Sequence, residues 1–365
     1  MKLERVIISG GGTGGHIFPA IAIADEIKER NPDVQILFVG AEGKMEMEKV
    51  PAAGYQIKGL QIVGLKRKLA LSNFLLPFKI IKSVLKARSI IKEFNPQVVI
   101  GVGGYASGPT LKAASMIGIP TLLQEQNSFP GKTNKLLAKK AKKICVAYDG
   151  LDRFFPAEKI VYTGNPTRKN MVDTTNKTSE ALEHFKLDKD KKTILIIGGS
   201  LGARTLNESL VNHINQIKGD TQVLWQCGKL YFENLKDQLD GKLPENIKLN
   251  QFIMRMDLAY AVADVVISRA GAISVSELCL VKKPTILVPS PNVAEDHQTK
   301  NAMSLVEKNA AIMIKDVEAK KTLIPATLQL LEDKEKMEQM SNAIALLGKP
   351  NATGEIVDQI ESIAR

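Results

Sequence analysis

Short apolar runs alternate with helical patterns along the whole chain. Residues 6–8 form a β-branched run that ends in five glycines within residues 10–15, and residues 20–30 then place Ile21, Ala24 and Ile27 on one helical face. Residues 34–39 form the next apolar run, so this part of the chain predicts a β-α-β unit. Glycines between a strand and a helix are typical of a loop that binds an anion, and they would equally form a tight structural turn.

The same order of strand, glycine loop and helix recurs twice. Residues 98–100 lead into glycines at 101–104 and a helix near residue 107, and residues 193–197 lead into a glycine loop at 198–203. This recurrence predicts two similar doubly wound α/β domains whose parallel sheets are covered on both faces. Helices are expected over residues 317–347 and 354–365. Further strands are expected at residues 121–123, 144–147, 160–166, 222–226, 247–253, 265–268, 285–288 and 311–314.

Composition fits this two-domain prediction. The 365 residues are 44% hydrophobic and 24% charged, and no run approaches the roughly 18 apolar residues of a spanning helix. The first apolar run leads into glycines rather than into a cleavage site, so we expect a cytosolic protein. Cys145, Cys227 and Cys279 lack the spacing of metal ligands and lie in apolar surroundings, which predicts buried, reduced thiols.

Positive charge is concentrated in the first half of the chain. Residues 1–164 hold 24 Lys and Arg against 13 Asp and Glu, whereas residues 165–365 hold 26 of each kind. Nucleic acid, an anionic membrane surface or a polyanionic substrate would each suit such a basic half, and solvated lysines that aid solubility are the plain alternative.

One basic segment also carries large apolar residues. Residues 49–92 contain no Asp or Glu, and residues 74–81 place Phe74 and Phe78 beside lysines. A helix of this composition can lie in a bilayer interface, with apolar groups among acyl chains and lysines at anionic headgroups. In the alternative, Phe78, Ile81 and Leu85 face the core and the lysines face water.

The candidate chemistry gathers at the ends of predicted strands. Residues 124–127 are a polar cluster after one strand, where open α/β sheets bind ligands. Residues 269–277 turn from strand into helix and offer backbone N–H groups that suit a diphosphate, with Glu277 placed to accept hydrogen bonds from ribose. Glu277 would alternatively form a capping box with Ser274. Residues 295–301 begin another helix whose side chains could bind sugar hydroxyls.

The first glycine loop also contains a histidine. A neutral imidazole at His16 could take a proton from an attacking hydroxyl, and it could alternatively cap the helix or support the loop. Asp188 and Asp190 match a D-x-D metal pattern, but they precede their strand among lysines, so we expect a solvated turn and no metal requirement.

Six motifs in register resemble the MurG family, the peptidoglycan N-acetylglucosaminyltransferases. They are residues 10–19, 101–109, 125–127, 164–168, 198–203 and 271–277, and the resemblance runs from residue 1 to about residue 355. It implies the GT-B fold, in which two Rossmann-like doubly wound domains face each other across a cleft. The implied parts are an N-terminal acceptor and membrane-docking domain (1–165), a C-terminal donor domain (166–347) and a terminal helix that packs back on the first domain (348–365).

The family's activity implies inverting, metal-independent transfer of GlcNAc from UDP-GlcNAc to the C4 hydroxyl of MurNAc in lipid I, undecaprenyl-diphosphoryl-MurNAc-pentapeptide. The product is lipid II. The resemblance implies that His16 is the base, and it places Gly103, Gly104, Tyr105 and Glu125 on the acceptor side. The family's donor contacts fall on Thr13, Gly14, Gly15, Asn127, Arg168, Ser200, Ile253, Ala272, Ile273, Ser274, Val275, Ser276, Glu277, Gln298 and Asn301.

Individual donor roles follow from the same resemblance. The backbone of Ile253 would contact uracil, and Glu277 would bind ribose. Ser200 and the amides of residues 272–274 would bind the diphosphate, and Gln298 with Asn301 would bind GlcNAc. The sequence departs from the commoner family pattern at Gln124 in place of histidine, at Ile273-Ser274 in place of Leu-Thr, and at His297 in place of the first of two glutamines.

The resemblance also predicts the partners. The basic first domain would dock peripherally on the cytoplasmic side of the bacterial inner membrane, through residues 66–92 and in particular Phe74, Phe78, Lys79, Lys82 and Lys86. Besides UDP-GlcNAc, lipid I and this anionic surface, it implies cell-wall synthesis proteins as partners, and no nucleic acid, cofactor or metal.

Three alternatives to this transferase remain at this stage. A related UDP-sugar enzyme, such as a glycolipid synthase or an epimerase-like protein, would share the fold. An NAD-dependent oxidoreductase is suggested by the spacing of Gly10, Gly12 and Gly15 with Glu42 after the second strand, although it would leave the second glycine loop without a role. A non-catalytic membrane or nucleic-acid adaptor would account for the basic half alone.

Overall fold

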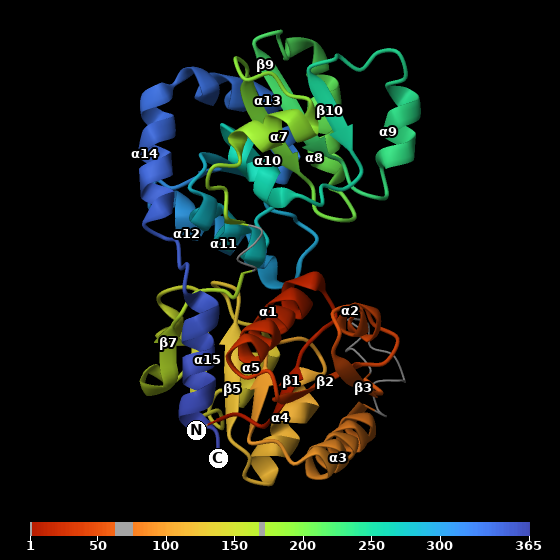
Figure 1. Ribbon diagram of the computed structural model, residues 1–365, viewed down its shortest axis with the longest axis vertical. Helices are drawn as coiled ribbons and strands as arrows, with labels where there is room; N and C mark the ends of the chain where they lie inside the picture. Colours follow the sequence, from red (N-terminus) through yellow and green to blue (C-terminus); the bar gives the residue numbers. More distant parts are fainter. Residues whose placement is uncertain (1, 63–75, 168–171) are drawn as a thin grey trace. The chain divides into compact units, whose positions relative to one another are not determined.

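The chain divides into two compact units, each with its own sheet. The computed structural model describes residues 2–62, 76–167 and 172–365 (Figure 1). The N-terminal unit comprises Met1–Thr167 together with Pro350–Arg365, and the C-terminal unit comprises Arg168–Lys349. Phe74, Arg168 and the beginning of the expected docking segment at residues 66–75 lie outside the described residues.

The N-terminal unit is a parallel sheet between two layers of helices. Its strand order is β3-β2-β1-β4-β5-β6-β7. The strands are β1 (Arg5–Ser9), β2 (Gln35–Ala41), β3 (Gln56–Leu60), β4 (Val98–Gly101), β5 (Thr121–Glu125), β6 (Lys143–Val146) and β7 (Ile160–Tyr162), and the helices are α1 (Gly14–Arg30), α2 (Glu46–Ala52), α3 (Leu76–Phe94), α4 (Ser107–Met116), α5 (Lys132–Leu137) and α15 (Ala352–Ile363).

Two apolar cores hold this sheet between its helices. Buried residues of α1 and α15 pack on one face, and buried residues of α3, α4 and α5 pack on the other. The central strands are therefore apolar on both faces, as expected for a parallel sheet. The terminal helix α15 packs beside α1 through Ile356, Val357 and Ile360, and Arg30 of α1 forms an ion pair of 2.7 Å with Asp358.

The C-terminal unit repeats the same architecture. Its strand order is β10-β9-β8-β11-β12-β13, and all pairs are parallel. The strands are β8 (Lys192–Ile197), β9 (Thr221–Gln226), β10 (Ile247–Asn250), β11 (Val265–Ser268), β12 (Thr285–Leu287) and β13 (Ile312–Met313), and the helices are α7 (Thr178–Phe185), α8 (Arg204–Asn212), α9 (Phe232–Gln238), α10 (Met256–Val262), α11 (Ala272–Val281), α12 (His297–Val306), α13 (Asp316–Glu332) and α14 (Lys334–Ala345). The expectation of two doubly wound, Rossmann-like domains is confirmed.

Several boundaries differ from the sequence-based expectation. Strand β7 ends at Tyr162 instead of residue 166. Helix α1 begins at Gly14 instead of residue 20, so Gly14 and Gly15 form its first turn and Pro19 lies inside it. Thr13 precedes the helix in an extended conformation, which shortens the glycine loop to residues 10–13. Strand β10 ends at Asn250 rather than near residue 253 because residues 251–255 leave the sheet and form the loop before α10.

The three cysteines are buried and free, as expected. Burial raises the pKa of the Cys145 and Cys279 thiols to about 12 and that of Cys227 to about 11. A buried thiol with a raised pKa is mostly protonated at neutral pH and is therefore a weak nucleophile.

Candidate active site

Each sheet has one point at which the strand order reverses. In the N-terminal unit β1 lies between β2 and β4, and in the C-terminal unit β8 lies between β9 and β11. The loops that follow such a strand pair leave toward opposite faces of the sheet, which opens a crevice at the carboxyl ends of the strands. Each of these points is a topological switch point of its sheet. The glycine loops after β1, β4 and β8 and the turn after β11 all lie at these two switch points.

The first two glycine loops pack against each other through their backbones. A Cβ atom on Gly10 would overlap the side chain of Val102, and one on Gly104 would overlap the carbonyl group of Gly11. Gly103 and Gly104 have φ values of +90° and +83°, which side chains disfavour. The glycines therefore allow both loops to lie close enough to form one surface, which brings Gly103 beside His16.

His16 projects from the first turn of α1 into this surface. Its Nδ1 lies 3.0 Å from the carbonyl oxygen of Gly11 and 3.4 Å from the hydroxyl of Thr13. A Cβ atom added to Gly103 would lie 3.0 Å from His16 Nε2. The Nε2 edge of the ring therefore faces the second glycine loop, whose next residue, Tyr105, is 58% exposed.

Glu125 organises the polar cluster at the end of β5. This buried carboxylate accepts hydrogen bonds from the backbone and side-chain nitrogens of Asn127, from the side chain of Asn134 at 2.8 Å and from the backbone of Gly131. Burial raises the pKa of Glu125, and these hydrogen bonds oppose the rise. Glu125 thus fixes the loop that carries Asn127.

The C-terminal unit offers backbone N–H groups at its own switch point. Helix α11 begins after Gly271, and Ala272, Ile273 and Ser274 in its first turn are partly exposed whereas Val275 is buried. Ser200 lies exposed in the loop after β8, and its carbonyl accepts a hydrogen bond from Lys229 at 3.0 Å. A helix N-terminus beside a glycine loop favours a negatively charged group such as a diphosphate.

Two further residues that are predicted to bind the sugar-nucleotide donor, Glu277 and Ile253, form hydrogen bonds with buried side chains. Tyr260 donates a hydrogen bond of 3.4 Å to Glu277, and burial, with the charge of Glu277 as a second cause, raises the pKa of Tyr260 well above its usual value. Gln226 accepts a hydrogen bond of 2.9 Å from the backbone N–H of Ile253. These two hydrogen bonds support Glu277 and the loop that carries Ile253.

The start of α12 carries the predicted sugar-binding residues. Gln298 accepts a hydrogen bond of 2.8 Å from the backbone of Ser290, so its carbonyl oxygen supports the loop before the helix. Asn301 is fully buried and donates to the carbonyl of Ala270 at 3.3 Å. In this arrangement Asn301 supports the turn that leads into α11, and His297 lies partly exposed one residue before Gln298.

Two family models match this chain, one for each unit. The glycosyltransferase family 28 N-terminal domain matches residues 6–146, and the family 28 C-terminal domain matches residues 193–356. The chain belongs to glycosyltransferase family 28. The two matched segments contain every switch-point loop described above.

Full-length relatives agree with the family models. A protein of Flavobacterium psychrophilum named UDP-N-acetylglucosamine–N-acetylmuramyl-(pentapeptide) pyrophosphoryl-undecaprenol N-acetylglucosamine transferase is 56% identical over 99% of this chain and 98% of its own length. A protein of Bacteroides fragilis with the same name is 55% identical over 99% of this chain and 96% of its own length. The solved structure of Acinetobacter baumannii MurG superposes with a TM-score of 0.80 at 32% identity, covering 98% of this chain and 99% of the other.

In this family 28 chain, α3 exposes an apolar face. Phe78 is 71% exposed, and Ile80, Ile81 and Leu85 are each more than half exposed. The alternative in which Phe78, Ile81 and Leu85 face the core is wrong, because Ser83, Ala87, Ile90 and Ile91 take the core-facing positions of this helix. No helix among the described residues is both long and apolar enough to cross a membrane.

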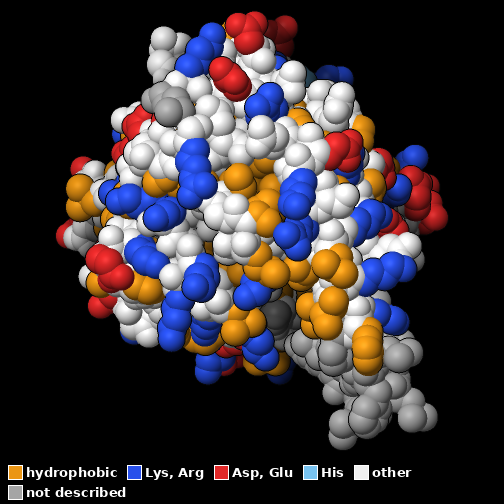
Figure 2. All heavy atoms as spheres, turned by 90° about the horizontal axis from the view of Figure 1, so that it is seen from below, with side chains coloured by type: hydrophobic (Ala, Val, Ile, Leu, Met, Phe, Trp, Pro, Cys, Tyr) orange, Lys and Arg blue, Asp and Glu red, His pale blue; other side chains and the backbone are white. Residues whose placement is uncertain are grey.

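Basic side chains surround this apolar face. Lys79 and Lys82 are exposed on α3, and Lys86 forms an ion pair of 2.8 Å with Glu42. Figure 2 shows Lys and Arg side chains interspersed with hydrophobic side chains over the face that is seen from below. A second basic run begins on α5, which packs on the same face of the sheet as α3. It comprises Lys132, Lys135, Lys139, Lys140, Lys142 and Lys143.

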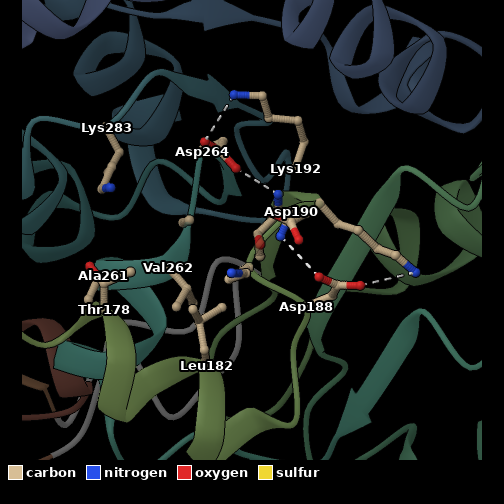
Figure 3. Close-up of a pocket in the computed structure, with 13 residues that line it drawn as sticks. Thr178, Leu182, Asp188, Asp190, Lys192, Ala261, Val262, Asp264 and Lys283 are labelled. Atoms are coloured by element: carbon tan, nitrogen blue, oxygen red, sulfur yellow. Dashed lines mark hydrogen bonds and ion pairs between the residues drawn. The ribbon is translucent and has the colours of Figure 1, made fainter.

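A cavity of about 250 Å³ lies at the amino ends of β8 and β11, whereas the switch point lies at their carboxyl ends (Figure 3). Its wall includes Asp188, Asp190 and Lys192 at the start of β8 and Asp264 just before β11. Lys192 pairs with Asp264 at 3.7 Å, and burial lowers the pKa of the nearby Lys283. Asp188 and Asp190 are both exposed, as expected of a solvated turn, and this turn borders the pocket. The described part of the chain holds no cluster of three or more residues suited to a metal ion.

Three residues of the site escaped the sequence analysis. Glu46 of α2 contacts the first glycine loop, Gln226 holds the Ile253 loop, and Tyr260 contacts Glu277. Each is a single polar residue in an ordinary strand or helix pattern. Only the tertiary contact marks them, so no spacing in the sequence would have identified them.

Proposed function

We propose that this chain transfers GlcNAc from UDP-GlcNAc to the C4 hydroxyl of MurNAc in lipid I, and so forms lipid II. The observation that carries the proposal is the 56% identity, over almost the full length of both chains, to a relative that is named for this transfer. The two switch-point sites support it, since one offers a histidine beside two glycine loops and the other a helix N-terminus for a diphosphate.

The C-terminal unit binds the donor in this proposal. The amides of Ala272, Ile273 and Ser274, with Ser200, bind the diphosphate, and Val275 and Ser276 complete the first turns of α11. Glu277 accepts hydrogen bonds from ribose, and the backbone of Ile253 contacts uracil through its carbonyl, because its N–H is bound to Gln226. Gln298 binds GlcNAc through its amide nitrogen, while Asn301 supports the turn before α11.

The N-terminal unit binds the acceptor and supplies the base. The C4 hydroxyl loses its proton to His16 Nε2 while its oxygen attacks C1 of GlcNAc on the side opposite the diphosphate. The bond between C1 and the diphosphate oxygen breaks, UDP leaves, and the configuration at C1 inverts. Gly103, Gly104, Tyr105 and Glu125 form the acceptor side, and Thr13, Gly14, Gly15 and Asn127 border the transferred sugar. Arg168 is a further donor contact by resemblance.

The leaving group needs charge stabilisation, which the proposal assigns to protein groups. Negative charge that develops on the UDP diphosphate is stabilised by the N-terminal dipole of α11 and its N–H groups. The reaction is then independent of a divalent metal.

The exposed face of α3 is the docking surface for the membrane. Phe78, Ile80, Ile81 and Leu85 enter the acyl boundary, while Lys79 and Lys82 lie at anionic headgroups. In this proposal the protein lies peripherally on the cytoplasmic side of the inner membrane, beside its lipid-anchored acceptor, where cell-wall synthesis proteins are within reach.

One assay tests the reaction and its metal independence together. Purified protein is incubated with labelled UDP-GlcNAc and a lipid I analogue, with EDTA or with added Mg²⁺. We expect labelled lipid II at equal rates in both. Absence of lipid II refutes the proposed transfer, and a UDP-GlcNAc-derived product without acceptor would favour a related UDP-sugar enzyme. A rate that requires Mg²⁺ refutes only the metal-free part.

A further inference from the structure

The first glycine loop rests on a buried carboxylate. Glu46, the first residue of α2, is 1% exposed. Its Oε2 accepts a hydrogen bond of 2.8 Å from the backbone N–H of Gly12, and its Oε1 accepts one of 2.9 Å from the backbone N–H of Ala41. Both oxygens therefore bind backbone donors, and charge-assisted hydrogen bonds of this kind are stronger than neutral ones.

Two glycines make the space that this carboxylate occupies. A Cβ atom on Gly11 would overlap the carboxyl group of Glu46, and one on Gly40 would lie 2.6 Å from its Cγ. Gly11 and Gly12 have φ values of +152° and +87°, so the peptide between them is flanked by two conformationally permissive residues. Such a peptide can rotate as a unit unless an outside group fixes it.

The same peptide contacts His16 on its other side. Its N–H, from Gly12, points to Glu46, and its carbonyl, from Gly11, lies 3.0 Å from His16 Nδ1. In a trans peptide these two groups point in opposite directions. Because a carbonyl oxygen only accepts hydrogen bonds, Nδ1 must carry the proton, and a neutral imidazole then has its lone pair on Nε2.

We propose that Glu46 is the positioning residue that fixes this peptide and thereby the tautomer of His16. A rotated peptide would turn the Gly11 carbonyl toward the Glu46 carboxylate, where two acceptors repel, and would turn the Gly12 N–H toward His16. Nδ1 would then become the acceptor and Nε2 would carry the proton, so the ring could not take a proton at Nε2. The link from tautomer to catalysis rests on the proposed function.

The variant Glu46→Gln tests this positioning role with little change in side-chain volume. Glutamine has one acceptor oxygen, so it satisfies only one of the two N–H groups and presents an NH₂ group to the other. Glu48→Gln is the matched control, since Glu48 lies on the same helix and pairs with the exposed Lys49 at 3.1 Å. The tautomer is read from imidazole ¹⁵N shifts in protein labelled at its four histidines, with His16→Asn to assign the signal.

We expect the Nδ1–H form of His16 in the wild type and in Glu48→Gln, and its loss in Glu46→Gln. We also expect kcat to fall about 10- to 100-fold in Glu46→Gln, with KM for UDP-GlcNAc changed less than about twofold. An Nε2–H form in the wild type overturns the proposal, as does an Nδ1–H form that persists in Glu46→Gln.

Two further outcomes remain decisive. If Glu46→Gln does not fold, Glu46→Asp replaces it, because its shorter side chain cannot reach both N–H groups, and the wild-type tautomer is still a test. In the other outcome, the wild type shows the Nδ1–H form and the variant loses it, but the wild type forms no lipid II. The proposed function then fails, while the role of Glu46 in setting the tautomer stands.

Discussion

The backbone N–H of Ile253 donates a hydrogen bond of 2.9 Å to Oε1 of Gln226, a residue that is 2% exposed at the end of β9. A nucleobase that binds the Ile253 backbone would therefore contact the Ile253 carbonyl in a loop that the Gln226 side chain holds in place. In the proposed nucleotide site, Gln226 thus acts through the Ile253 backbone and not on the ligand itself.

Replacing Gln226 should therefore weaken nucleotide binding. Gln226→Leu leaves the Ile253 N–H without this partner and lets the loop move, so we expect the Kd for UDP to rise about tenfold, equivalent to about 1.4 kcal/mol. Isothermal titration with UDP measures this change. Asn250→Ala is the control, since the side chain of Asn250 donates a hydrogen bond of 3.0 Å to Lys248 on its own strand. An unchanged Kd in Gln226→Leu would contradict the assignment of Ile253.

Glu277 should affect donor binding more than turnover. Glu277→Ala removes the proposed acceptor for the ribose hydroxyls, so we expect KM for UDP-GlcNAc to rise about tenfold or more while kcat falls much less. Tyr260→Phe removes the hydroxyl that bonds Glu277 at 3.4 Å and leaves the carboxylate in place, so its effect should be smaller. Steady-state kinetics separate the two. A larger effect in Tyr260→Phe would mean that Glu277 acts through Tyr260 and not on the donor.

His16 should affect turnover more than donor binding. Loss of a general base costs about 10²- to 10⁴-fold in rate, so His16→Ala should lower kcat by that range with a nearly unchanged KM for UDP-GlcNAc. His184→Ala is the matched control, because that histidine packs on Phe185 in the C-terminal unit, away from the switch point. Normal turnover in His16→Ala would show that another group takes the proton.

The sequence was most informative where one residue type has one physical role. Glycine runs after apolar strands marked both switch points, because positive φ values and close backbone contacts need residues without a Cβ atom. The start of α1 was misplaced because Gly14 and Gly15 look like loop residues, while in the fold they form a helical turn after Thr13. Asn301 is predicted to contact the sugar, and its hydrogen bond to Ala270 could be found only in the structure.

Helix α3 illustrates a different limit. Its apolar residues occupy more than one side, since Ala87, Ile90 and Ile91 are buried while Phe78, Ile81 and Leu85 are exposed. Periodicity alone cannot say which apolar side faces the core. The sheet makes that choice by offering a surface to only one side, so the exposed apolar face had to be seen in the structure.

Membrane docking through α3 should depend on its charges and its apolar residues separately. Each lysine near an anionic surface contributes about 1 kcal/mol, so Lys79→Glu with Lys82→Glu should weaken binding to anionic vesicles at least tenfold. Lys86→Glu should have a smaller effect because Lys86 is paired with Glu42. Phe78→Ala should weaken binding even at high salt, where the lysine contribution is screened. Vesicle sedimentation measures all three, with Lys236→Glu on α9 as the control, and equal binding by all variants would exclude α3.

Stability at low pH should depend on Asp257, which links α10 to α7. Asp257 bonds Arg255 and Lys177 at 2.8 and 2.9 Å, and the hydrogen bond from Arg255, as the largest cause, holds the pKa of Asp257 well below its usual value. A depressed pKa in the folded state stabilises the protein above the unfolded-state pKa of about 3.9, and this contribution is lost as the pH falls toward the folded-state pKa.

Asp257→Asn should therefore lower the free energy of unfolding at pH 7 by about 1–3 kcal/mol. The difference from the wild type should shrink below about pH 4. Urea unfolding at pH 7 and pH 3.5 measures both values, with the exposed Asp237→Asn as the control. A difference that stays constant with pH would mean that the Asp257 charge does not contribute to stability.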